Sequence, residues 1–237
     1  MLSLPVAVLA GGLATRLRPL TAQLPKALLP IAGRPFIFHQ LELLRHQGIE
    51  QVVLCLGHRG EQIRAAVETA LPPGLAVRYS FDGPQPLGTA GALRKALPLL
   101  GAQFFVLYGD SYLPCALSPI ADAYRAARCA ALMTILHNDN NWDRSNVLFS
   151  GGRLLAYDKR TPRPGMAHID FGISVLSSAV LARCSAPDPL DLADLLHELA
   201  QRGELAAFEV SGRFYEIGSI AGLKDTEEYL ARQVSGA

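Results

Sequence analysis

The first half of the chain alternates between short apolar runs and segments whose apolar residues recur every three to four positions. The short runs have the length of buried strands, and they are Pro5–Ala10, Gln51–Leu56, Ala76–Phe81 and Phe104–Tyr108. The periodic segments predict helices at Pro35–Gln47, Glu61–Ala70 and Thr89–Leu97, the last with Thr89 as its cap. This β-α-β order indicates an α/β fold with a mostly parallel central sheet and helices on both faces.

The second half is less regular, and we expect it to form a lobe against the first within one continuous domain, residues 1–237. Its predicted strands are Ala130–His137, Ile169–Leu176, Leu205–Val210 and Phe214–Ile217, with a hairpin of Asn146–Ser150 and Arg153–Asp158 around two glycines. Its predicted helices are Pro119–Arg128, Leu190–Arg202 and Ile220–Val234.

Composition narrows the class of protein. Of the 237 residues, 50% are hydrophobic and 18% are charged, which suits a folded chain with a large core. No apolar run approaches the roughly 18–20 residues of a membrane-spanning helix, and no basic segment precedes the first strand, so we expect a cytoplasmic protein. The net charge of +1, without a basic block, favours neither nucleic acid nor a membrane as partner, and is compatible with a homo-oligomer.

Two polar segments fall at the carboxyl ends of predicted strands, where α/β sheets bind their ligands: Gly11-Gly12 and Gly109-Asp110. Two glycines let the backbone approach a ligand, and successive amides cradle anionic oxygens, with Arg16 close enough to reach phosphates. The loop is neither a Walker P-loop nor G-x-G-x-x-G, because no Gly-Lys-Ser/Thr follows and Ala14 stands where a further glycine is needed. A plain strand-to-helix turn is the alternative interpretation, and spacing does not choose between them.

Other positions allow both a structural and a functional interpretation. Lys26, one of four lysines, is either a surface residue or reaches into the phosphate site. Gly88 and Gly91 weaken the start of a helix, which indicates that a ring or a neighbouring helix packs closely there. Asp110 either forms a turn or, beside a phosphate cradle, binds a metal. For Cys55, in an apolar run, packing is the better explanation.

Together these segments resemble the sugar-1-phosphate nucleotidyltransferases (nucleoside-diphosphate-sugar pyrophosphorylases), from Leu9 to about Leu230. The matching segments are Leu9-Ala10-Gly11-Gly12, Thr15-Arg16-Leu17, Pro19-Leu20-Thr21, Pro25-Lys26, Pro86-Leu87-Gly88-Thr89-Ala90-Gly91-Ala92, Gly109-Asp110, Asp158-Lys159 and Glu216-Ile217-Gly218. The short chain and its Leu-Gly-Thr-Ala-Gly-Ala segment look most like the guanylyltransferases for mannose 1-phosphate and D-glycero-D-manno-heptose 1-phosphate.

The resemblance implies a Rossmann-like nucleotide-binding half, residues 1–115, and a smaller sugar-binding lobe with a closing helix, residues 116–237. It implies that an NTP, with GTP favoured, reacts with a manno-configured sugar 1-phosphate, heptose or mannose, to give an NDP-sugar and pyrophosphate, with Mg²⁺ as cofactor. The implied catalytic residues are Arg16 and Lys26, and the implied metal ligands are Asp110 and Glu216. Nucleotide contacts are implied for Leu9, Ala10, Gly11, Gly12, Gly88 and Thr89. Sugar-phosphate contacts are implied for Asn146, Asp158, Lys159, Asp170 and Gly172, with a turn or hairpin role as the alternative for all of these except Lys159.

Two positions depart from the family pattern. Ala14 replaces the usual glycine, and because alanine prefers a negative φ we expect a slightly remodelled loop. Glu216 stands where the family usually has aspartate, and alternation along Phe214–Ile217 should direct it toward the crevice, opposite Asp110.

Two alternative functions stay open. One is a uridylyltransferase for an amino-sugar 1-phosphate, and the other is a catalytically silent relative that binds a nucleotide sugar or a protein. The presence together of Arg16, Lys26 and Asp110 argues against silence, because a binding module has no need to neutralise charge at an α-phosphorus.

Overall fold

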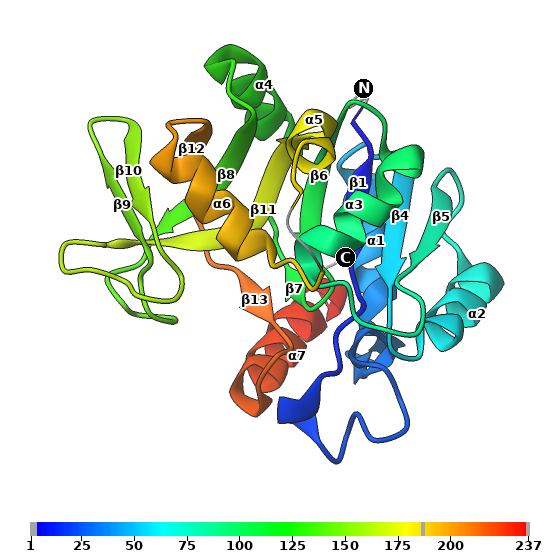
Figure 1. Cartoon of the computed structure of the whole chain (residues 1–237). Helices are drawn as coiled ribbons and strands as arrows, with labels where there is room; N and C mark the ends of the chain where they lie inside the picture. Colours follow the sequence, from blue (N-terminus) through cyan, green and yellow to red (C-terminus); the bar gives the residue numbers. More distant parts are fainter. Residues whose placement is uncertain (1–3, 186–187, 236–237) are drawn as a thin grey trace.

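A nine-stranded sheet forms the centre of the computed structural model, which describes residues 4–185 and 188–235 (Figure 1). Its strands are β1 (Val6–Leu9), β4 (Gln51–Leu56), β5 (Ala76–Phe81), β6 (Gln103–Tyr108), β8 (Ala131–His137), β9 (Val147–Ser150), β10 (Arg153–Tyr157), β11 (His168–Ser177) and β12 (Leu205–Glu209). The predicted strands of both halves are thus present, with ends shifted by a few residues.

Pairing in the first half is parallel throughout, in the order β5-β4-β1-β6. Strand β11 lies antiparallel to β6 and to β8, and β12 then pairs in parallel with β8. The β9–β10 hairpin is antiparallel and meets the start of β11 at His168. The prediction of a mostly parallel central sheet is confirmed, with the antiparallel pairing concentrated around β11.

Helices cover both faces of the sheet, as predicted (Figure 1). One face packs against α1 (Phe36–His46), α2 (Gly60–Ala70) and α4 (Leu117–Ala127), and the other against α3 (Thr89–Leu100), α5 (Ser178–Ala182) and α6 (Leu192–Gln201). Alternation along β1 explains the two layers, because Val6 and Val8 join the first core and Ala7 joins the second.

Several short elements surround the pocket end of the sheet. They are the single-turn helices η1 (Thr15–Leu17) and η2 (Lys26–Leu28), the pair β2 (Pro30–Ile31) and β3 (Arg34–Pro35), and the pair β7 (Ser111–Tyr112) and β13 (Tyr215–Glu216). Helix α7 (Ile220–Ser235) follows β13 and closes a small third core containing Ile31, Phe36, Ile217 and Leu230. The sequence predicted β13 and α7. It did not predict η1, η2, β2, β3, β7 or α5, because two to five residues are too few to show a period.

Among the helices that the structure describes, none combines the length and the apolar composition needed to span a bilayer.

Candidate active site

A pocket of about 290 Å³ opens at the carboxyl ends of β1 and β6, where the sequence predicted the ligand crevice. The glycine loop that follows β1, the start of α3 and the turn after β6 form its walls. Predicted site residues that line it are Leu9, Ala10, Gly11, Gly12, Lys26, Gly88, Thr89 and Asp110. Polar groups from segments far apart in the chain therefore converge on one cavity.

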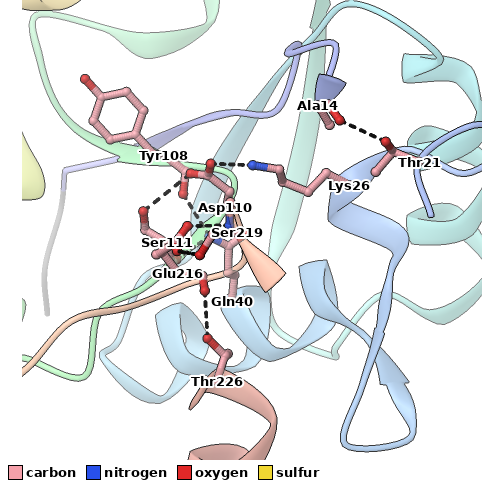
Figure 2. A network of polar contacts seen from close by, with 11 residues as sticks. Ala14, Thr21, Lys26, Gln40, Tyr108, Asp110, Ser111, Glu216, Ser219 and Thr226 are labelled. Carbon is pink, nitrogen blue, oxygen red and sulfur yellow. Dashed lines mark hydrogen bonds and ion pairs between the residues drawn. The ribbon is translucent and has the colours of Figure 1, made fainter. Parts of the chain in front are cut away.

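Lys26 and Asp110 form an ion pair inside this pocket, with 2.8 Å between Lys26 Nζ and Asp110 Oδ2 (Figure 2). Their side chains are 16% and 33% exposed, so water screens the pair only in part. The buried Ala27 and Leu28 anchor η2 and thereby hold Lys26 over the pocket. The site thus has a cation and an anion within direct reach of each other and of a bound ligand.

Gln40 of α1 holds the turn that presents Asp110. Its Nε2 donates to the carbonyl oxygens of Tyr108, at 2.9 Å, and of Ser111, at 2.6 Å, and the side chain is buried (Figure 2). Sequence reasoning missed this residue. A polar residue on the apolar stripe of a predicted helix, between Ile37 and Leu44, was the signal that could have revealed it.

The glycine loop keeps a glycine-like conformation at Ala14, which contradicts the expectation of a remodelled loop. Ala14 has φ 48° and ψ 39°, in the left-handed region. Its carbonyl accepts hydrogen bonds from Thr21 Oγ1, at 2.8 Å, and from the amide of Leu17, at 3.2 Å. These bonds and the buried Leu17 side chain hold the strained backbone in place.

Arg16 lies on η1, with an exposed side chain, and is not part of the pocket lining. Within the described chain it forms no ion pair. Its position beside the glycine loop leaves the guanidinium able to move toward a ligand.

Thr89 does not cap α3 as predicted; its hydroxyl serves α6 instead. Thr89 Oγ1 donates to Asp191 Oδ1, at 3.0 Å, and accepts from the amide of Leu192, at 2.7 Å. The close approach predicted from Gly88 and Gly91 is real, but the neighbour is neither a ring nor a helix. A side chain at either glycine would overlap the segment at 188–190 that precedes α6.

Three of the predicted sugar-phosphate residues gather around Tyr108, which itself lines the pocket. Lys159 Nζ lies 5.6 Å from the centre of the Tyr108 ring, and a methyl group at Gly172 would lie 3.9 Å from the same ring. Asp170 accepts a hydrogen bond of 2.9 Å from the Gly172 amide. Burial raises the pKa of Asp170, and the neighbouring Lys159 ammonium offsets part of this rise.

Asn146 and Asp158 make local structural bonds instead. The buried Asn146 accepts a hydrogen bond of 3.0 Å from the Asp170 amide, so it orients that segment of β11. Asp158 accepts from the amides of Thr161, at 2.7 Å, and Arg160, at 3.0 Å, and these bonds lower its pKa. Neither residue lines the pocket.

Glu216 lies near Lys26, since a methyl group at Gly218 would contact both the Glu216 carboxylate and Lys26 Nζ, but it is not part of the pocket lining. Pairing of β13 with β7 sets it opposite Ser111, and the Ile217 amide donates to the Asp110 carbonyl at 2.9 Å. The carboxylate turns to the start of α7, where it accepts from the amide of Gly218 and from Ser219 Oγ at 2.7 Å (Figure 2).

Two further pocket residues, Asp82 and Cys55, were not assigned to the site from the sequence. Asp82 directly follows β5, so the signal that singled out Asp110, an acid at a strand end, applied to it equally. Cys55 is 1% exposed, and burial raises the pKa of its thiol to about 12, which confirms that it is a packing residue.

These features define a doubly wound α/β protein whose pocket lies at the strand ends. Residues 6–144, more than half of the chain, match the family model described as Nucleotidyl transferase. The chain belongs to this family, and the resemblance deduced from the motifs is confirmed.

Curated relatives are similar over most of this chain. Mannose-1-phosphate guanylyltransferase catalytic subunit beta of Drosophila melanogaster is 29% identical over 216 residues, which are 89% of this chain and 58% of that protein. Glucose-1-phosphate thymidylyltransferase of Streptomyces griseus is 28% identical over 225 residues, 91% of this chain and 63% of that protein. The chain thus spans about three fifths of the length of these relatives.

Solved structures share the whole fold. HddC from Yersinia pseudotuberculosis superposes with a TM-score of 0.83 at 23% identity, covering 96% of this chain and 99% of that one. HddC complexed with GMP-PN gives a TM-score of 0.80 at 24% identity, with the same coverage. At 23–24% identity these similarities show the fold alone. It is the Rossmann-like nucleotidyltransferase fold that the resemblance implied.

Proposed function

We propose that the chain transfers a nucleotidyl group from an NTP, with GTP preferred, to a manno-configured sugar 1-phosphate, mannose or heptose, and releases pyrophosphate. The observation that supports this most is the Lys26–Asp110 pair in the pocket beside Gly11-Gly12. The preference for GTP rests on the relatives named as guanylyltransferases and on the HddC complex with GMP-PN.

The chemistry needs alignment and charge neutralisation rather than a protein nucleophile. A phosphate oxygen of the sugar phosphate attacks the α-phosphorus, a new P–O bond forms, and the bond to the β-phosphate oxygen breaks. Pyrophosphate departs with the electron pair, and no proton has to move. Two polyanions must be held in line against their repulsion, which is work for cationic side chains.

The cationic side chains divide this work by their positions. Lys26, held by η2, exchanges its contact with Asp110 for the oxygens around the α-phosphorus. Arg16, exposed beside the glycine loop, closes over the β- and γ-phosphates. Lys159, whose ammonium lies 5.6 Å from the ring centre of the pocket residue Tyr108, receives the sugar phosphate.

The donor set at Asp110 fits Mg²⁺ as the cofactor. Mg²⁺ takes carboxylate and phosphate oxygens and keeps several waters, so one pocket carboxylate and the phosphates of the substrate suffice. Within residues 4–185 and 188–235, no three His, Cys, Asp or Glu side chains gather into a group that could hold a metal. When bound, Mg²⁺ supplies charge neutralisation at the phosphates.

A pyrophosphate-release assay with Mg²⁺ tests the proposal, with GTP, UTP, CTP and dTTP each paired with mannose, heptose and amino-sugar 1-phosphates. GTP with a manno-type phosphate should give the highest kcat/KM; a maximum with UTP and an amino-sugar phosphate would select the uridylyltransferase. Lys26→Ala and Arg16→Ala should each lower kcat by on the order of 10²-fold or more, with a smaller change in nucleotide Kd. Lys224→Ala, on the exposed side of α7, is the matched control and should keep full activity. If no pair of substrates turns over faster than the Lys26→Ala variant, the chain is a silent binding relative.

A further inference from the structure

The turn that joins β4 to α2 contacts both ends of the glycine loop, residues 11–25. At the first end, the His58 amide donates to the Gly11 carbonyl oxygen at 3.3 Å. Toward the other end, Arg59 Nη2 donates to the Ala22 carbonyl oxygen at 2.5 Å. One short turn therefore ties the loop to the strand beside β1.

The glycine loop has few other anchors. Of the described residues 12–24, only Leu17 and Thr21 are buried, and most of the others are exposed. The Thr21 hydroxyl donates to the Ala14 carbonyl oxygen, so this bond lies within the loop and does not tie it to the rest of the protein (Figure 2). A segment with so little buried surface opens at low free-energy cost unless its few contacts with the scaffold hold it.

The backbone fixes the place from which Arg59 reaches the loop. Arg59 has φ 56° and ψ 25°, in the left-handed region, directly before α2. The next residue, Gly60, is buried, and a methyl group there would lie 2.7 Å from Leu56 Cβ and 3.1 Å from the Phe81 ring, so α2 begins directly against β4 and β5. Strained residues of this kind concentrate at functional sites, and here the strained residue directs a guanidinium at the loop.

We propose that Arg59 is a positioning residue, which holds the glycine loop in the conformation from which Arg16 reaches the phosphates of the bound NTP. Arg59 is not part of the pocket lining, so it acts through the loop rather than on the substrate. Lys26 is held separately, by the buried Ala27 and Leu28 of η2, so Arg59 affects Arg16 and leaves Lys26 in place. This inference rests on the proposed function, which assigns Arg16 to the phosphates.

Arg59→Gly removes the guanidinium without straining the backbone, because glycine adopts the left-handed conformation freely. Arg128→Gly is the matched control. Arg128 also has a positive φ, of 50°, but it follows α4 at the edge of the sheet opposite the pocket, where β8 begins. Each variant removes the strain of one left-handed arginine and makes the unfolded chain more flexible, so both should stay folded, with melting temperatures within about 5 °C of the wild type.

Hydrogen exchange followed by mass spectrometry measures the loop without any substrate. In Arg59→Gly, the amides of residues 12–24 should exchange about tenfold faster than in the wild type, because one charge-assisted hydrogen bond to the scaffold is lost. In Arg128→Gly these amides should exchange at the wild-type rate. Arg59→Lys keeps a cationic donor and should recover part of the protection. Unchanged exchange of residues 12–24 in Arg59→Gly would show that other contacts hold the loop and would overturn the proposal.

Turnover with the best substrate pair tests whether Arg59 acts through Arg16. Arg59→Gly should lower kcat by about tenfold, with a change in the Kd for GTP of less than about threefold, measured by calorimetric titration. When Arg16 is already alanine, adding Arg59→Gly should lower kcat by less than about twofold, because the residue that the loop positions is gone.

Two outcomes would contradict the positioning role. An equal loss of kcat in both backgrounds, or a loss that appears mainly as weaker GTP binding, would show that Arg59 contacts the nucleotide itself. If no substrate pair turns over, the proposed function fails, while faster exchange of residues 12–24 in Arg59→Gly still identifies Arg59 as the residue that holds the loop.

Discussion

Glu216 stabilises the β13–α7 corner, and its replacement should lower stability whether or not a metal is present. One carboxylate oxygen accepts from the Gly218 amide and the other from Ser219 Oγ, which is the N-cap of α7 and in turn accepts from the Gly222 amide at 2.9 Å. The absence of a side chain at Gly218 and Gly222 makes this possible, since a methyl group at either position would overlap the carboxylate. The longer side chain of glutamate thus reaches the Gly218 amide and the Ser219 hydroxyl at the start of α7.

The size of the effect follows from these contacts. Glu216→Gln keeps the length of the side chain but turns one acceptor oxygen into a donor that faces Gly218 or Ser219. It also removes a negative charge from the positive end of a helix, an interaction of about 0.3–1 kcal/mol. With one charge-assisted hydrogen bond lost at a half-exposed site, we expect the free energy of unfolding to fall by about 1–2 kcal/mol. For a chain of this length the melting temperature should fall by about 2–8 °C.

Thermal unfolding in EDTA and in millimolar Mg²⁺ is the appropriate assay. Glu216→Gln should lose the same stability in both buffers. Ser219→Ala should lose less when combined with Glu216→Gln than when made alone in the wild type, because the two side chains share one hydrogen bond. Glu228→Gln, further along α7 and 4.0 Å from Lys224, is the control and should change stability by less than about 0.5 kcal/mol.

The opposite pattern would refute this reasoning. If Glu216→Gln melts like the wild type in EDTA but loses the stabilisation that Mg²⁺ and nucleotide confer, the carboxylate serves the metal rather than the helix. Turnover then should require more Mg²⁺ in this variant, whereas a residue that only braces α7 leaves the Mg²⁺ requirement unchanged.

Three further predictions follow from the pocket. Ala14→Gly removes the strain of a left-handed alanine, about 1–2 kcal/mol, but makes the unfolded chain more flexible, which costs about 0.4–1 kcal/mol. It should therefore raise stability in urea by up to about 1.6 kcal/mol and keep activity. Gln40→Leu removes the hydrogen bonds to the Tyr108 and Ser111 carbonyl oxygens, so the free energy of unfolding in urea should fall by about 1–3 kcal/mol, and kcat should fall as Asp110 shifts. The pKa of Asp82 is raised in the folded state, mainly by burial, while Lys95 attracts its charge and Asp188 repels it. The group therefore favours folding below its unfolded pKa, and this contribution is lost as the pH rises through the folded pKa. Asp82→Asn should therefore raise the melting temperature at pH 7, and a pH series should show the gain shrinking toward pH about 3.9; a gain that grows on acidification would contradict it.

The sheet and the pocket position were predictable because local rules govern them. Apolar runs separated by helical periods define β1, β4, β5 and β6, and parallel strands place Gly11-Gly12 and Gly109-Asp110 at one edge whatever the rest of the chain does. The ion pair between Lys26 and Asp110, which are 84 residues apart, was not predicted. The family motifs implied only that both residues belong to one site.

What the sequence did not predict depends on contacts between distant segments. The Gln40 side chain binds carbonyls 68 and 71 residues away, and Thr89 binds residues more than 100 positions away. Intrinsic preference predicts that threonine before a helix caps that helix, but here a partner from elsewhere competes for the same hydroxyl and wins. The backbone of Ala14 similarly follows the hydrogen bond from Thr21 rather than the preference of alanine.

The start of α3 shows how one motif serves two halves of the chain. A helix N-terminus with free amides is a ready site for phosphate, but the Leu190 carbonyl already accepts from the Ala90 amide at 2.9 Å. The segment before α6 can approach this closely because Gly88 and Gly91 have no side chains, and Thr89 then completes the cap of α6. The Ala90 amide is therefore already occupied, and the start of α3 contributes a wall of the pocket. The Gly-Thr-Ala-Gly segment is thus explained by packing of the second half against the first, because residues 188–190 press directly on glycines at the start of α3, which is part of the pocket wall.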